Sequence, residues 1–126
     1  MKFLPRTTLL LLLLTASCYY DDPPQPGETD LESVSFNNHV VPIFERACDS
    51  PGCHFTGAVA PDLTAENAYD ALVGGGYVNT TLPTSSILYL RVSGTSAGGI
   101  MPPEGRLPQL EVDLILAWIE KGALND

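Results

Sequence analysis

The segment Cys48–His54 constrains this chain more than any other part of its sequence. It holds two cysteines separated by four residues, and a histidine directly follows the second cysteine. Two thiols can add to the two vinyl groups of a haem, and an adjacent imidazole can bind the haem iron. The usual spacer between such cysteines has two residues, so this spacer departs from the common pattern. We interpret Cys48 and Cys53 as attachment sites for one haem c, and His54 as an axial ligand of its iron.

A methionine beside two prolines is the candidate for the second axial ligand. Met101 directly precedes Pro102 and Pro103, and two glycines lie just before it in the chain. A lone methionine is more often a filler of the hydrophobic core than a ligand. These neighbours suit a rigid loop better than a core, so we interpret Met101 as a ligand. His39, the only other histidine, is the competing ligand, and we expect it on the solvated side of a helix.

Two other uses of the cysteines stay open. Cys48 and Cys53 could form a disulfide, because a short loop that contains a proline and a glycine can close in that way. They could also bind zinc, but tetrahedral closure needs four protein ligands and the chain has only one histidine beyond the motif. We favour haem attachment, because it also accounts for the histidine beside the second cysteine and for Met101.

Residues 1–17 have the composition of a secretory signal peptide. Lys2 and Arg6 form a short basic region, and Leu9–Leu14 is an apolar run that is too short to span a bilayer. Cys18 follows directly after small residues, as the lipidated cysteine does in bacterial lipoproteins. We expect cleavage before Cys18 and a lipid on its sulfur, with an ordinary cleaved signal as the alternative. This use of Cys18 leaves no unpaired thiol in an oxidising compartment.

Two further segments follow the predicted signal peptide. Residues 18–33 are acidic, rich in proline and poor in apolar side chains, so we expect a flexible tether. Residues 34–126 form one small domain. So few residues make a small core, and a covalently held macrocycle would enlarge it.

The hydrophobic pattern predicts an all-α domain. Apolar residues at spacings of three and four, with turn residues between them, predict helices at 38–47, 65–72, 87–92 and 110–121. Asn37 is the expected cap of the first helix. The last helix has the clearest buried stripe, formed by Leu114, Ile115, Trp118 and Ile119. No alternating run is long enough to predict a sheet.

This arrangement resembles class I cytochromes c, most closely the small bacterial domains on exported lipoproteins and on larger planctomycete-type proteins. The resemblance covers about residues 34–125 and rests on Phe44, Cys48, Cys53, His54, Ala71–Gly75, Ser86–Leu88, Met101–Pro103 and Trp118–Ala123. It implies a cytochrome c-like fold of about four short helices around one haem. The four-residue spacer is the point at which the chain departs from the family pattern.

The resemblance also implies roles for residues outside the motif. The first and last helices of the fold cross, so Phe44 is expected to pack near Trp118. The carbonyl of Pro61 is expected to accept a hydrogen bond from the second ring nitrogen of His54. Arg91 is either a partner for a haem propionate or an ordinary surface arginine.

We therefore predict an electron carrier rather than an enzyme. Bound by both His54 and Met101, the iron would have no open position for a substrate. The chain has a formal charge of −9, which becomes −11 without Lys2 and Arg6, and much of it lies in the tether. This charge argues against nucleic acid as a partner. It favours redox proteins of a respiratory or periplasmic oxidoreductase system that dock through a basic face.

Two functions from other classes remain as alternatives. If Met101 is displaced, the haem could serve as a sensor of small ligands or as a peroxidase-like centre. If Cys48 and Cys53 form a disulfide, the protein could be a haem-free surface lipoprotein. In each case the predicted location is periplasmic or at the cell surface, with a lipid anchor in a bacterial membrane.

Overall fold

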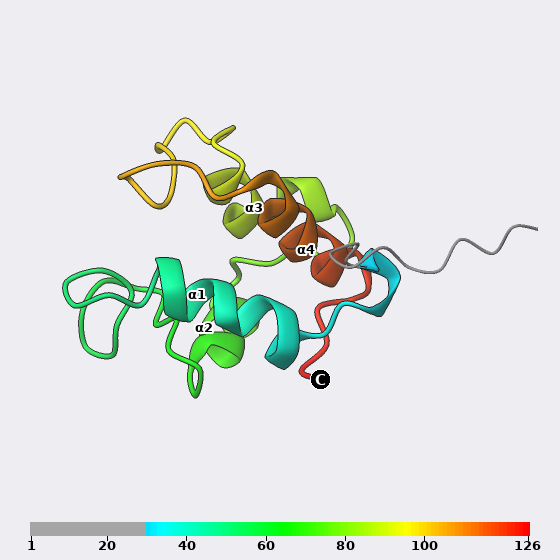
Figure 1. Ribbon diagram of the computed structural model, residues 1–126, viewed down its shortest axis with the longest axis horizontal. Helices are drawn as coiled ribbons and strands as arrows, with labels where there is room; N and C mark the ends of the chain where they lie inside the picture. Colours follow the sequence, from blue (N-terminus) through cyan, green and yellow to red (C-terminus); the bar gives the residue numbers. More distant parts are fainter. Residues whose placement is uncertain (1–29) are drawn as a thin grey trace, which may run out of the picture.

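The computed structural model describes residues 30–126, which fold into helices joined by loops without any strand (Figure 1). The all-α class is therefore confirmed for this part of the chain. The predicted signal peptide, Cys18 and most of the predicted tether lie outside the described residues. The end of the tether forms a single 3-10 turn, η1 (Leu31–Ser33), and the Asp30 side chain caps it by accepting a hydrogen bond from the Glu32 N–H.

The first helix begins earlier than its sequence pattern predicts. A wide π-type turn, η2 (Phe36–Val40), leads into α1 (Val41–Ala47). Its cap is Ser35 instead of the expected Asn37, and the Ser35 hydroxyl accepts a hydrogen bond from the backbone of Asn38 at 3.3 Å. The wide turn precedes Pro42, which has no N–H to donate to the preceding turn and so interrupts the regular ladder.

The later helices lie close to their predicted positions. They are α2 (Ala68–Gly74), α3 (Ile87–Val92) and α4 (Gln109–Glu120), and a short 3-10 turn that was not predicted, η3 (Pro83–Ser85), precedes α3. Helix α2 begins three residues later than predicted, because Thr64 and Asn67 are held in a turn by the Asp62 side chain. No helix within residues 30–126 is long and apolar enough to cross a bilayer.

The core is organised around one aromatic side chain. Phe36 is 1% exposed, and its ring centre lies 4.8 Å from that of Trp118, 5.5 Å from Tyr69 and 6.3 Å from Phe44. The predicted pairing of Phe44 with Trp118 is therefore corrected: Phe36 lies against both rings. The early helix start is the reason, because it brings Phe36 of η2 against Trp118 of α4.

Two loops extend from the same side of the helices. The loop after α1 and the loop between α3 and α4 both lie to the left of the helices in Figure 1. The four buried residues predicted for α4 are all confirmed as core, so this helix faces the interior along its length. The loops are therefore free to form a site beyond the packed helices.

Replacing Phe36 with alanine should destabilise the protein by about 3–5 kcal/mol, because it removes the ring that three aromatic neighbours contact. Urea unfolding measures this free energy. The matched control is Phe55→Ala, since Phe55 is 47% exposed. Equal effects of the two substitutions would contradict the central role of Phe36.

Candidate functional site

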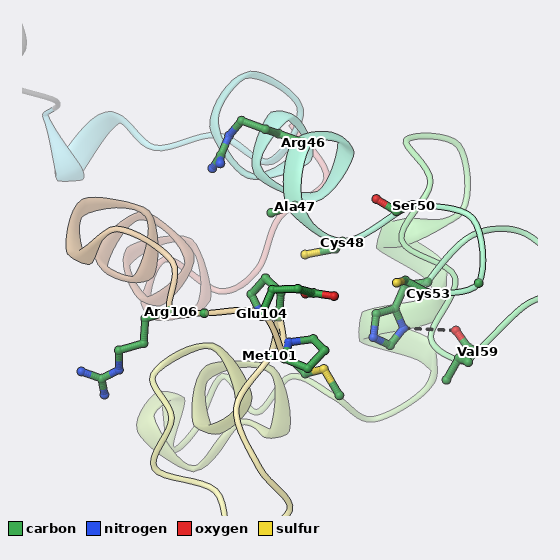
Figure 2. Close-up of a pocket in the computed structure, with 14 residues that line it drawn as sticks. Arg46, Ala47, Cys48, Ser50, Cys53, Val59, Met101, Glu104 and Arg106 are labelled. Carbon is green, nitrogen blue, oxygen red and sulfur yellow. Dashed lines mark hydrogen bonds between the residues drawn. The ribbon is translucent and has the colours of Figure 1, made fainter.

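A cavity of about 590 Å³ lies between the loop after α1 and the loop before α4. Its volume falls within the range of about 300–1,000 Å³ that is typical of ligand sites. Figure 2 shows the two cysteine sulfurs and the Met101 side chain around this space. The structure thus brings four of the residues singled out from the sequence to one cavity, namely Cys48, Cys53, His54 and Met101.

A second cavity, of about 320 Å³, adjoins the first. Three of the four residues, Cys48, His54 and Met101, line both cavities. The remaining wall is mostly apolar and is formed by Val59, Ala60, Pro61, Leu63, Leu72, Tyr77, Ile87, Leu88, Arg91 and Val92. A predominantly hydrophobic wall is usual in sites that bind small molecules and cofactors.

The spacer between the cysteines folds into a closed loop. Cys48 directly follows α1 as its C-terminal cap, and its N–H donates to the Phe44 carbonyl at 2.7 Å. Gly52 has a φ of +87°, a value that favours glycine, and it turns the chain back. The N–H of His54 then donates to the Cys48 carbonyl at 3.0 Å. This hydrogen bond places the histidine beside the first cysteine despite the four-residue spacer.

The ring of His54 is held by two backbone carbonyls. Its Nδ1 atom lies 3.0 Å from the carbonyl oxygen of Pro61 and 3.1 Å from that of Val59. A ring nitrogen that faces carbonyl oxygens carries the proton, so Nε2 keeps its lone pair and can bind a metal. Pro61 was singled out from the sequence. Val59 was not, because a backbone acceptor leaves no trace in residue type.

The two thiols differ in their surroundings. Both are free in the structure, with Cys48 buried and Cys53 partly exposed. Burial, together with the nearby Asp49 carboxylate, raises the pKa of Cys48 to about 11. Its thiol is therefore neutral at physiological pH, as suits a group that faces an apolar cavity.

Basic side chains gather at the cavities. Arg46 and Arg106 line the larger one and Arg91 lines the smaller one, so only Lys121 of the four basic residues after position 30 lies elsewhere. Arg46 also forms an ion pair with Glu111 of α4. In a chain of net negative charge, this is where an anionic group of a ligand would be favoured.

Arg91 lies against the Met101 loop. Its guanidinium donates to the carbonyls of Gly98 and Gly99. Sequence reasoning missed Arg46 and Arg106. The position of Arg46 two residues before Cys48 could have identified it, whereas nothing local to Arg106 points to the site.

The competing ligand lies elsewhere. The Nδ1 atom of His39 accepts a hydrogen bond from the Ser35 backbone at 3.0 Å, and His39 lines neither cavity. Within residues 30–126 no three histidine, cysteine or acidic side chains come together as a metal site. Cys48, Cys53, His54 and Met101 are the residues at the cavity that could hold a cofactor.

Comparisons of the chain with known protein families, with curated proteins and with solved structures found no match.

A hydrogen-bonded turn supports the Pro61 carbonyl. The side chain of Asp62 accepts hydrogen bonds from the Thr64 backbone at 3.1 Å, from the Thr64 hydroxyl at 2.6 Å and from Asn67 at 3.0 Å. The Thr64 hydroxyl, foremost among these donors, lowers the pKa of Asp62 below its usual 3.8. The ionised carboxylate therefore stabilises the turn that follows the histidine loop.

This network predicts a pH-dependent effect of Asp62→Ala on unfolding in urea. The folded pKa is depressed, so the carboxylate contributes stability above the usual value of 3.8 and loses it as the pH falls through the folded pKa. The variant should be less stable than the parent at neutral pH, and the difference should shrink below pH 3.8. Glu66→Ala, at an exposed site nearby, is the control. A difference that stays constant with pH would contradict this role.

Proposed function

We propose that this protein is an exported monohaem c-type cytochrome that carries single electrons between redox proteins. The observation that carries the proposal is the cavity lined by Cys48, Cys53, His54 and Met101. These groups are two thiols, an imidazole and a thioether, which together are what covalent attachment and two axial bonds require. A cytochrome c-like arrangement of the helices is part of the same proposal.

Each residue has a distinct role in holding the group. Cys48 and Cys53 would hold the haem covalently through their sulfurs, and Nε2 of His54 and the sulfur of Met101 would bind its iron. The carbonyls of Pro61 and Val59 hold the proton on Nδ1 and fix the plane of the ring. When bound, the haem supplies one-electron redox chemistry.

The chain's own residues favour electron transfer over catalysis. If Met101 and His54 both bind the iron, a bound haem would offer no free position to a substrate. A neutral thioether ligand and nearby arginines favour the reduced state, so we expect a raised reduction potential. The apolar wall of the smaller cavity would keep water away from the bound haem, and this would limit the rearrangement of solvent during electron transfer.

Location and partners follow from the same proposal. A signal peptide at residues 1–17 and a lipid on Cys18 would anchor the domain to a bacterial membrane, with residues 18–33 as its tether. Export fits the chemistry, since c-type haem is attached outside the cytoplasm. The acidic chain then favours a redox partner with a basic docking face.

The test is the mass of the protein exported together with a haem-maturation system, measured under denaturing conditions. The wild type should gain the mass of one haem, because thioether bonds survive denaturation. The double variant Cys48→Ala and Cys53→Ala should lose this gain. Cys18→Ala is the matched control, since it should keep the haem and lose the association with membranes.

Other results would favour the alternative functions. A mass lower by two hydrogens and no haem would indicate a disulfide between Cys48 and Cys53, and the electron-carrier proposal would fail. Covalent haem that rapidly binds carbon monoxide in the native protein would indicate an open axial position. That result would favour the sensor or peroxidase-like function.

A further inference from the structure

The stretch 98–105, which carries Met101, is hydrogen-bonded to the rest of the fold through a single residue. Residues 98–105 lie in the loop 93–106 between α3 and α4. Among the described residues, Arg91 is the only residue outside this loop with which 98–105 form hydrogen bonds. The N–H of Met101 donates to the Arg91 carbonyl at 3.0 Å. The Arg91 guanidinium donates to the carbonyls of Gly98 and Gly99, with 3.3 Å to Gly99. Arg91 thus binds the loop through both its backbone and its side chain.

The loop has a space that accommodates the guanidinium. A β-carbon added at Gly98 would lie 2.5 Å from Cζ of Arg91, so the guanidinium, at the far end of a flexible side chain, would have to move away from the loop. Gly98 does not have a left-handed backbone, so an alanine would meet steric rather than conformational resistance there. The glycine at this position therefore permits the contact with Arg91.

We propose that Arg91 is the positioning residue for Met101. It holds the loop so that the thioether stays at the cavity shared with His54. The inference rests on the proposed function, because it concerns the bond between Met101 and a haem iron. It differs from both alternatives that the sequence left open for Arg91, a propionate partner or an ordinary surface arginine, since the guanidinium binds two backbone carbonyls.

The two roles of Arg91 require different chemistry. Pairing with a propionate needs a positive charge, which lysine also supplies. Binding two neighbouring carbonyls needs the planar fork of arginine, which lysine lacks. Arg91→Lys and Gly98→Ala both keep a positive charge at this position, but each disturbs the contact with the loop.

The experiment uses the full chain, exported and loaded with haem, as wild type, Arg91→Ala, Arg91→Lys and Gly98→Ala. The readouts are the long-wavelength absorption band that thioether sulfur gives to ferric haem, and binding of carbon monoxide to ferrous haem. The wild type should show the band and bind carbon monoxide slowly. Each variant loses a charge-assisted hydrogen bond to the loop. The fraction of protein in which Met101 is dissociated from the haem iron should therefore rise roughly tenfold. The band should weaken accordingly.

Gly74→Ala is the control, because a β-carbon there meets nothing within 4 Å and Gly74 lies in helix α2. It should behave as the wild type does. If Arg91→Ala fails to fold, Gly98→Ala decides the result, since it keeps Arg91 intact.

The outcomes separate this inference from the proposed function. If the wild type carries no covalent haem, both the proposed function and this inference are wrong. A wild type with covalent haem but no thioether band removes Met101 as ligand and overturns the inference. If the thioether band of Arg91→Ala and Gly98→Ala is as intense as that of the wild type, the inference is overturned and the proposed function is unaffected.

Discussion

The packing of Phe36 against Trp118 joins the two ends of the folded chain. The same end of η2 is held by hydrogen bonds from the N–H groups of Phe36 and Asn37 to Asp126. Both contacts anchor the start of the first helix to α4 and the segment after it. Because α1 is short and continuous with η2, its opposite end is placed with it, and that end carries Cys48 to the cavity. The aromatic contact thus sets the position of a thiol that it does not touch.

Local features could be predicted from the sequence. The spacing of apolar residues identified α3 with its correct bounds and α4 within one residue at each end, because helix periodicity is a local property. The first helix was less predictable. Its start depends on Asp126, which is 90 residues away from Phe36 in the chain, and no local pattern reveals such a partner.

The candidate site, too, was predictable only in part. Cys48, Cys53, His54 and Met101 could be singled out because their chemistry is specific, and the structure places them at one cavity. The contact of Arg91 with Gly98 could not be predicted, because it depends on the path of a loop rich in glycine. Residue type shows which groups can react, whereas the fold decides which groups support them.

The hydrogen bond from the His54 N–H to the Cys48 carbonyl brings the two ends of the segment between the cysteines together. Ser50, Pro51 and Gly52 are all exposed, so residues at the tip of this segment contribute little to the packed interior. Insertions are tolerated best at such exposed tips. A lineage of related chains could therefore gain or lose residues here while the geometry of the histidine stays the same. The length of the spacer is then a poor criterion for deciding which sequences belong to such a lineage.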